Sequence, residues 1–450
     1  MENKTILNRA LGPWQAASVV VGTIIGTGIF LKTATMAQLA GSMPAVMTVW
    51  VVSGLLSYAG ALTYAELSAR FPSSGGEYVF LREAYGGLPA FLFGWMRFLV
   101  GTPGSIAAYA AGTAAFAAGL GLYSAERIPG GPPAVAVSLI ILFSLLNCLQ
   151  VRWGARAQTL LTALKCGLIL ALVAGAAFFG SPAEAPAAAA APAAALPGYS
   201  AFGLAMIAAL WAFDGWNNLP MLGEEVRDPR RNLPLALALG VLAVLALYLA
   251  ANWAYFHVLS LDEIRSGNST AHPSALPVAT LAARSFLGEA GVPLLSAAFM
   301  ISALGAMNGS ILSGARVPFA MARDGVFFRG LARIAPGAHV PARAVLAQGV
   351  LASVLAVSGT FDQLTDWVVV CGWTFYALCV STLFVFRKRD GAEPPAFRVP
   401  GFPYLPLLFI AAALMLVGNS LWRDPRAGLY GVLLVAAGCP VYLWMRRRVP

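Results

Sequence analysis

The sequence predicts an all-α integral membrane protein with twelve transmembrane helices, two of them discontinuous. Hydrophobic residues make up 59% of the 450 positions and charged residues only 11%, whereas soluble globular proteins have about 25% charged residues. Apolar runs of roughly 20 residues, the length that crosses a bilayer, recur along the whole chain. Glycine and polar residues interrupt two of these runs, at 22–28 and 211–218.

The predicted helices follow the apolar runs, at 13–35, 43–68, 86–117, 132–150, 157–180, 200–223, 233–258, 291–321, 342–358, 363–386, 403–421 and 427–445. A short amphipathic segment at 74–84 is expected at the cytoplasmic surface. The Ala- and Pro-rich stretch 181–198 and the polar stretch 259–290 are expected outside, and the loop 387–402 inside.

We expect one domain over residues 1–450. Both interrupted helices are the first of a group of five, at 13–180 and at 199–386. An odd number of spans inverts the second copy, so the two groups are expected to be inverted repeats, with helices 11 and 12 added at 403–446. Two broken helices in corresponding positions are typical of a secondary transporter site.

Basic residues are distributed unevenly between the two sides of the predicted bundle. Of the 29 Lys and Arg residues, we place twenty on one side, six on the other and three inside helices, namely Arg97, Lys165 and Arg316. Basic loops face the cytoplasm, so both termini are expected there. This distribution favours lipid as the surrounding partner and argues against nucleic acid. Arg97 and Arg316 lie nearer the helix ends and are expected to reach the surface.

The first interruption, Gly22 to Gly28, is expected to unwind and free its backbone groups. The N–H groups of Gly26, Thr27 and Gly28 would start the outer half-helix, where the positive end of the helix dipole suits a carboxylate. Carbonyl groups up to Ile24 would end the inner half-helix and suit an ammonium group. The alternative is close packing of small residues between helices.

The second interruption adds carbonyl groups around Trp211 and Ala212. Together the two interruptions would bind a molecule with an α-carboxylate and an α-amine. Asp214 is an ionisable residue inside a span, so it either holds a cationic group of the substrate, braces the amine site or caps the following half-helix. Trp211 either covers the substrate or is an ordinary interface tryptophan.

Lys165 lies several residues inside the fifth helix. A buried ammonium group needs partners or loses its proton. The carbonyl groups of the first helix and the polar patch 306–310 of the eighth are candidates, and the lysine would then act as a fixed cation in place of a sodium ion. The alternative is that its side chain reaches the cytoplasmic surface.

The sequence offers no catalytic or metal-binding pattern. The three histidines lie in or beside loops, no strand precedes the glycine pattern, and the five cysteines lie in apolar segments without metal spacing. We therefore expect no enzyme activity, no cofactor and no metal. A channel is disfavoured because discontinuous helices around a closed site are typical of a carrier.

The chain resembles the amino acid–polyamine–organocation superfamily, and within it the L-type amino acid transporter family and its bacterial homologues. The resemblance covers the whole chain and rests on VGTIIGTGIF at 21–30, ALTYAELSARFPSSGGEYVFLREAYG at 61–86 and LWAFDGWNNLPMLGEEVRDPRRNLPLAL at 210–237. It implies a LeuT-like 5+5 inverted repeat in a bacterial inner membrane. It also implies that Gly26, Thr27 and Gly28 bind the substrate carboxylate, and that Ile24 and the carbonyls near Trp211 bind the amine.

The same resemblance gives Lys165 a role. It matches the family's helix 5 lysine, which faces the region that sodium occupies in sodium-coupled relatives. Gly305 and Asn308 match the helix 8 side of that region. Asn308 stands where sodium-coupled members present a hydroxyl group, which implies a sodium-independent design.

Three further positions bear on the substrate and partner. Trp211 matches the gating aromatic of helix 6. Asp214 matches an aspartate of the mammalian exchanger of cystine and dibasic amino acids, which favours cationic substrates. Asn218 replaces a hydrophobic or aromatic residue, which argues against bulky substrates. The loop 123–133 has no cysteine, so no disulfide-linked heavy subunit is expected.

These observations predict a sodium-independent exchanger of neutral or cationic amino acids that works by alternating access. The alternative is a proton-coupled symporter or uniporter in which Lys165 releases its proton during the cycle.

Overall fold

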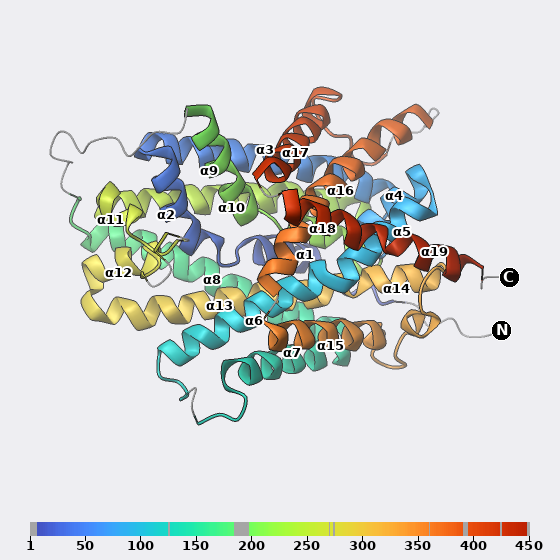
Figure 1. Ribbon diagram of the computed structural model, residues 1–450, viewed down its shortest axis with the longest axis horizontal. Coiled ribbons are helices and arrows are strands. Elements are labelled where there is room, and N and C mark those ends of the chain that lie inside the picture. The colour runs from blue at the N-terminus through green and yellow to red at the C-terminus, as the bar shows by residue number, and fades with distance from the viewer. Residues whose placement is uncertain are drawn as a thin grey trace.

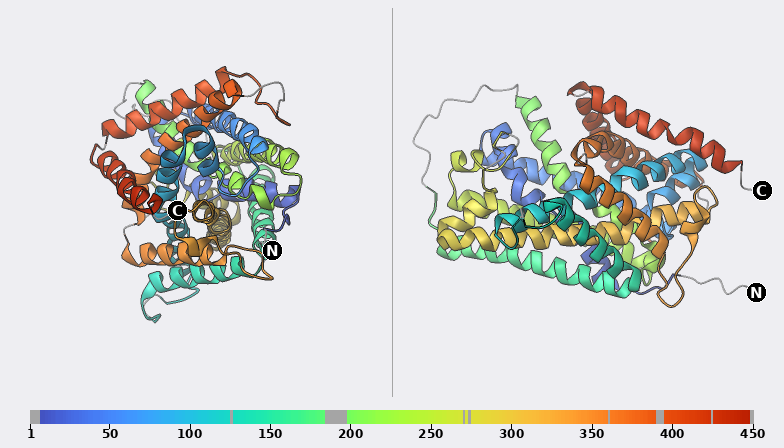
Figure 2. Two further views of the ribbon diagram at one scale, coloured as in Figure 1. Left: turned by 90° about the vertical axis from the view of Figure 1, so that its right-hand side faces the viewer. Right: turned by 60° about the horizontal axis from the view of Figure 1, so that its bottom comes forward.

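Helices that run roughly along one long axis make up the structure, a computed structural model (Figure 1). It describes residues 7–124, 127–183, 198–269, 271–272, 275–359, 361–389, 395–423 and 425–447. Viewed down the long axis, the helices form a bundle (Figure 2). Most of the predicted outer loop 181–198 lies outside the described residues.

The helices of the first half lie close to their predicted positions. They are α1 (Pro13–Ile24), α2 (Gly28–Ala40), α3 (Met43–Arg70), α4 (Glu77–Tyr85), α5 (Gly87–Met96), the π-helical turn η1 (Arg97–Gly101), α6 (Thr102–Gly119), α7 (Gly131–Leu149) and α8 (Val151–Phe179). The chain is thus interrupted between α1 and α2, as predicted.

The second half contains more short elements than we predicted. It comprises α9 (Gly198–Ala212), the 3₁₀ turns η2 (Trp216–Met221) and η3 (Gly223–Glu225), α10 (Pro229–Val258), α11 (Leu261–Arg265), α12 (Val278–Leu287), the 3₁₀ turn η4 (Gly288–Ala290), α13 (Gly291–Gly314), α14 (Arg316–Arg323), the 3₁₀ turn η5 (Arg329–Ala332), α15 (Ala342–Ser358), α16 (Phe361–Arg389), α17 (Tyr404–Arg423), α18 (Pro425–Ala436) and α19 (Gly438–Arg446).

Within the described residues, eight helical segments are long and apolar enough to cross a membrane. They are Pro13–Ala40, Met43–Arg70, Gly131–Leu149, Val151–Phe179, Pro229–Val258, Val278–Arg323, Tyr404–Trp422 and Gly428–Arg446. The predicted third, sixth, ninth and tenth helices fall on α5–α6, α9 with η2, α15 and α16. The total of twelve spans and the inverted repeat therefore stay predictions.

Residues with special backbone properties set several helix ends. Gly41 ends α2 with a φ of 74°, a left-handed conformation that glycine adopts without strain. Ser42 then caps α3, because its hydroxyl oxygen accepts a hydrogen bond from the N–H of Ala45 at 3.4 Å. Pro44 follows in the first turn, where a missing N–H costs nothing.

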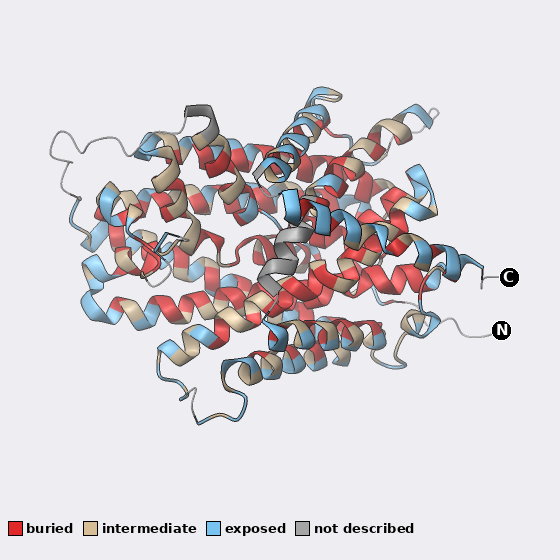
Figure 3. Ribbon diagram, viewed as in Figure 1, coloured by how far each residue is buried: buried red, intermediate tan, exposed pale blue. Residues whose placement is uncertain are grey.

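The buried residues lie in the middle of the bundle, and the exposed faces belong to peripheral helices such as α7 and α18 (Figure 3). In Figure 1, α11 and α12 lie at one end of the long axis and α14 and α19 at the other. The interruptions after α1 and after α9 lie between these two ends, inside the bundle.

Candidate functional site

The first interruption leaves only part of its backbone free. Helix α1 ends at Ile24 and α2 begins at Gly28. The first N–H groups of α2, including that of Gly28, have no preceding helical turn to bond to. Our prediction for Gly26 is wrong in one respect: its N–H donates to the carbonyl of Ile24 at 2.8 Å. A tight turn closes the inner end of the interruption and uses that donor.

The second interruption packs directly against the first. Helix α9 ends at Ala212, and Gly215 follows with a φ of 120°. A Cβ atom at Gly215 would lie 2.7 Å from the carbonyl oxygen of Thr23, so only glycine fits. The hydroxyl of Thr23 donates to the carbonyl of Gly215 at 2.9 Å. This contact joins the end of α1 to the turn after α9.

Tyr248 of α10 connects the same two interruptions. Its hydroxyl group lies 3.1 Å from the carbonyl oxygen of Ile24 and 3.0 Å from that of Ala212. These are the carbonyl groups that the sequence predicts as partners of a substrate amine. Tyr248 is not among the predicted site residues, although it is the single hydroxyl group within the apolar run 241–251, a pattern that indicates a buried polar role.

Lys165 of α8 is buried, with 1% of its surface exposed. Its ammonium nitrogen Nζ donates to the carbonyl oxygens of Gly22 at 2.9 Å, Ile25 at 2.6 Å and Ser302 at 2.9 Å. The side chain therefore joins α8 to the interruption after α1 and to α13, and it does not reach the surface.

Ser302 of α13 contacts the same interruption, and the sequence did not predict its role either. Its hydroxyl group lies 3.1 Å from the carbonyl oxygen of Ile25 and 2.8 Å from that of Gly26. Three side chains, Tyr248, Lys165 and Ser302, thus hold the carbonyl groups that the interruption frees.

The two predicted helix 8 residues lie differently. A Cβ atom at Gly305 would come within 2.8 Å of the Lys165 ammonium group, so Gly305 makes room for the lysine. Asn308 points elsewhere: its amide donates to Gly154 and Gln158 at 3.1 and 2.9 Å, and its oxygen accepts from Asn147 at 2.9 Å. Asn308 therefore links α13 to α7 and α8, and the structure does not bring it to the Lys165 amine.

A cavity of about 490 Å³ lies beside the two interruptions. Its lining includes every predicted substrate-binding residue: Ile24, Gly26, Thr27, Gly28, Trp211, Ala212, Asp214 and Asn218. It also includes residues that the sequence did not single out, among them Arg97, Tyr109 and Phe299. Its size is within the range of small-molecule sites in proteins.

Asp214 and Trp211 are both accessible from this cavity. The Asp214 side chain is exposed, and its Oδ1 accepts a hydrogen bond from the Tyr376 hydroxyl at 2.7 Å. Trp211 is 40% exposed, and the amine of Lys32 lies 4.6 Å from the centre of its ring. Among the described residues no side chain caps the 3₁₀ turn η2 that follows, and its N-cap residue is Gly215, so Asp214 does not have the capping role.

Two arginines that we expected at the surface are internal. Arg97 lies in η1, lines the cavity and donates through Nη2 to the Oδ1 of Asn218 at 2.9 Å. Pro103, six residues later, lacks an N–H, and a π-helical turn fits before such a position. Arg316 is fully buried and forms two hydrogen bonds with Glu225, at 2.7 and 2.9 Å.

The Arg316–Glu225 pair belongs to a layer of hydrogen bonds between the interruptions and the end that bears α14. The N–H of Leu11 donates to Glu225 at 2.9 Å, and the N–H of Arg227 donates back to Leu11 at 2.8 Å. The N–H of Gly75 donates to Met221 at 3.1 Å. We call this layer the inner closure, defined by Leu11, Gly75, Met221, Glu225 and Arg316.

Comparisons with known proteins agree with this picture. A family model described as amino acid permease matches residues 11–442. The chain is 30% identical to the serine/threonine exchanger SteT of Bacillus subtilis, over 98% of each chain. It is also 30% identical to the human b(0,+)-type amino acid transporter 1, over 97% of this chain and 88% of the relative. The human cystine/glutamate transporter matches at 30% over 98% and 86%.

The apolar helices and the relatives define a multi-pass membrane transporter and not an enzyme. The chain belongs to the amino acid permease family, within the amino acid–polyamine–organocation superfamily. Its relatives are amino acid transporters and exchangers, which makes amino acids its class of substrate.

Proposed function

We propose that the protein is a sodium-independent amino acid exchanger that works by alternating access. The observation that carries the proposal is the Lys165 ammonium group among the carbonyl oxygens of Gly22, Ile25 and Ser302. Carbonyl oxygens are hard ligands of the kind that bind small cations. A covalently attached cation already occupies them here, so transport needs no sodium ion at this position.

The substrate would lie in the cavity beside both interruptions. The N–H groups at the start of α2 suit its carboxylate, and the carbonyls of Ile24 and Ala212 suit its amine. Each carbonyl oxygen accepts two hydrogen bonds, so the Tyr248 hydroxyl leaves room for an amine. Trp211 would close over the bound substrate from the outer side.

The side-chain end of the site bears both signs of charge. Asp214 supports the acceptance of cationic side chains, while Arg97 opposes it from the same cavity. The two opposite charges together favour neutral amino acids with polar side chains. Cationic amino acids are accepted when the attraction of their side chain to Asp214 exceeds its repulsion by Arg97.

The proton-coupled alternative needs Lys165 to lose its proton. The three N–H groups of an ammonium match its three acceptors, and a neutral amine would leave one of them without a donor. This geometry supports the exchanger. We also propose the 5+5 inverted repeat, an inner-membrane location with both termini in the cytoplasm, and function without a disulfide-linked heavy subunit.

Proteoliposomes test the proposal. Labelled amino acid should enter vesicles preloaded with unlabelled amino acid at least tenfold faster than empty vesicles, and equally fast in sodium or choline buffer. Equal uptake into empty vesicles would rule out obligate exchange. Stimulation by sodium would contradict the role of Lys165. A competition panel of neutral and cationic amino acids then defines the substrates.

A further inference from the structure

Glu77, the first residue of α4, is a buried carboxyl group outside the predicted spans. None of its surface is exposed, and Asn217 of η2, which faces it, is 1% exposed. The Asn217 amide nitrogen Nδ2 donates to Glu77 Oε1 at 2.8 Å. Within the described residues, Glu77 has no ion-pair partner.

One side-chain oxygen of each residue has no hydrogen-bond donor among the described residues. Both Glu77 Oε2 and Asn217 Oδ1 are buried and unpartnered. Leaving buried acceptors unpaired is costly, most of all for a charged carboxylate. A proton on Oε2 changes this, because a neutral carboxylic acid is a donor as well as an acceptor. An acid and an amide that already share one hydrogen bond can then form a second, from Oε2–H to Oδ1.

The groups around Glu77 do little to stabilise its charge. Four groups disfavour an added negative charge: Tyr64 of α3, Asp214 after α9, and Tyr376 and Cys379 of α16. Among the described residues, the cation that favours it is Arg97 of η1. Burial outweighs Arg97 and raises the pKa of Glu77 from 4.5 to about 7.

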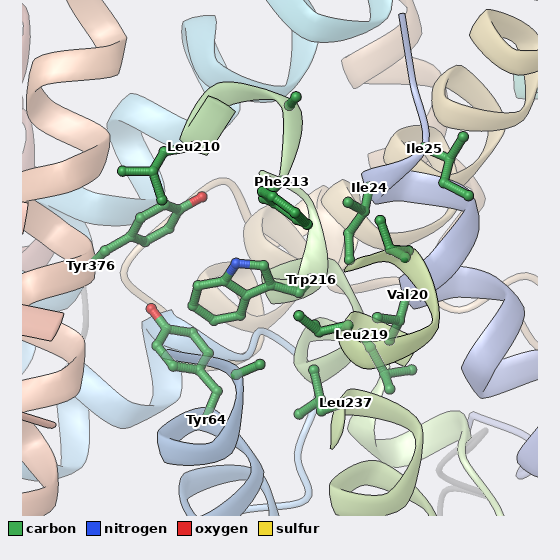
Figure 4. Close-up of a cluster of buried hydrophobic side chains, with 14 of the residues drawn as sticks. Val20, Ile24, Ile25, Tyr64, Leu210, Phe213, Trp216, Leu219, Leu237 and Tyr376 are labelled. Atoms are coloured by element: carbon green, nitrogen blue, oxygen red, sulfur yellow. The ribbon is translucent and has the colours of Figure 1, made fainter. Parts of the chain in front are cut away.

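The pair lies between the second interruption and the inner closure. Trp216, next to Asn217, packs against Tyr64 and Tyr376, with ring centres 4.7 and 5.8 Å apart (Figure 4). At the other end of η2, Met221 accepts from Gly75, two residues before Glu77. A change in the Glu77–Asn217 pair therefore acts on both the substrate cavity and the closure.

We propose that Glu77 and Asn217 form a proton-binding site that stabilises the inner closure. Glu77 carries the proton while the closure is shut. When the closure opens, water reaches Glu77, the Oε2–H bond breaks, the proton passes to that water, and the carboxylate that remains is solvated. The inference rests on the proposed alternating access for its role in transport, whereas the proton site itself does not.

Substitution of Glu77 tests the site. Glu77→Gln keeps the shape of the neutral acid and supplies a permanent donor. Glu83→Gln is the control, since Glu83 lies on the same helix, is exposed and pairs with Arg82 at 2.6 Å. Thermal unfolding of the purified protein without substrate is measured from pH 4 to 9, and amino acid exchange in proteoliposomes from pH 5 to 9.

The sign of the effect follows from the raised pKa. The contribution of Glu77 to stability is full below about pH 4.5, declines as the unfolded chain ionises, and is lost once the pH passes about 7. The unfolding temperature of the native protein and of Glu83→Gln should therefore fall over this range relative to Glu77→Gln. Exchange by the native protein should change about threefold or more between pH 6 and 8, and by Glu77→Gln much less.

Parallel unfolding profiles for the native protein and Glu77→Gln would overturn the proton site. If the native protein and Glu77→Gln differ in how unfolding temperature depends on pH but not in how exchange depends on pH, the link between the proton site and the closure is overturned. A failure of exchange in every variant would refute the proposed function, and the unfolding profiles would still decide on the proton. If Glu77→Gln does not fold, Asn217→Asp replaces it. Two facing carboxyl groups share one proton more tightly than an acid and an amide do. The fall in the unfolding temperature of Asn217→Asp should therefore move to higher pH.

Discussion

Replacement of Lys165 by alanine tests the hydrogen bonds that connect α8 to the first interruption and to α13. The ammonium group has three carbonyl acceptors, but they do not depend on it equally. Ile25 keeps a share of the Ser302 hydroxyl group, which lies 3.1 Å from its carbonyl oxygen and 2.8 Å from that of Gly26. Ser302 lies within α13, where its carbonyl group also accepts from the next helical turn. Gly22 depends on the lysine most, because the N–H of Gly26 donates to Ile24 instead.

The expected magnitude follows from this unequal dependence. One hydrogen bond from a charged donor to a carbonyl group without another partner is worth about 1.5–3 kcal/mol. A loss of about 2 kcal/mol from one transport conformation changes its population relative to the other about 30-fold, since 1.4 kcal/mol is a factor of ten. We therefore expect Lys165→Ala to lower the exchange rate at least tenfold.

The assay is exchange of labelled amino acid in proteoliposomes, with reconstituted protein quantified for each variant. Arg152→Ala is the control, because Arg152 is an exposed cation on the same helix. It should exchange at the native rate. Lys165→Ala exchanging at half the native rate or faster would refute the reasoning.

Three further substitutions have defined outcomes. Asp214→Gly should weaken competition by arginine and lysine more than competition by alanine, and a uniform loss would contradict charge recognition. Tyr248→Phe removes one O–H donor, whose single proton is shared between the carbonyl oxygens of Ile24 and Ala212 and is worth about 0.5–1.5 kcal/mol. Apparent substrate affinity should therefore fall about two- to tenfold in a binding assay, with unfolding temperature as the control. Unchanged affinity would argue against a role for Tyr248 in holding these carbonyl groups. Gly215→Ala places a Cβ atom 2.7 Å from the carbonyl oxygen of Thr23, in a left-handed backbone conformation. This strain costs about 1–3 kcal/mol, so exchange should fall at least fivefold. Gly203→Ala is the control and should exchange at the native rate, because nothing lies within 4 Å of a Cβ atom there.

The sequence predicted the helices well because apolar length is a direct consequence of the bilayer. It also located both interruptions, since glycine and polar residues inside such runs are hard to explain otherwise. It did not predict the extra short elements around α12 or the π-helical turn at Arg97. These depend on which helix packs against which, and that information is not local in sequence.

The sequence predicted eight of the residues that line the cavity, but not the side chains that hold the backbone beside it. Gly28 and Asp214 are conspicuous in the pattern, whereas Ser302 is an ordinary residue until α13 brings it to the interruption. Arg97 and Arg316 were placed at the surface because a long side chain near a helix end usually reaches water. In the structure the Glu225 carboxylate pairs with Arg316. Arg97 donates to the amide oxygen of Asn218 and lines the cavity, so its side chain points into the bundle.

The contacts between the two interruptions explain how substrate binding can be coupled to a change of conformation. The Tyr248 hydroxyl group holds the carbonyls of Ile24 and Ala212 together, and the substrate amine is proposed to bind those same two groups. An amine that binds there competes with the hydroxyl group or adds to it, and in either case it changes the bonds that join α1 to α9. Lys165 meanwhile holds the other side of the same interruption to α8 and α13. Substrate can therefore shift α1 relative to α8 and α13, which hold the other side of the interruption. Alternating access requires such a difference, because a ligand shifts a conformational equilibrium only when it binds one conformation better than the other.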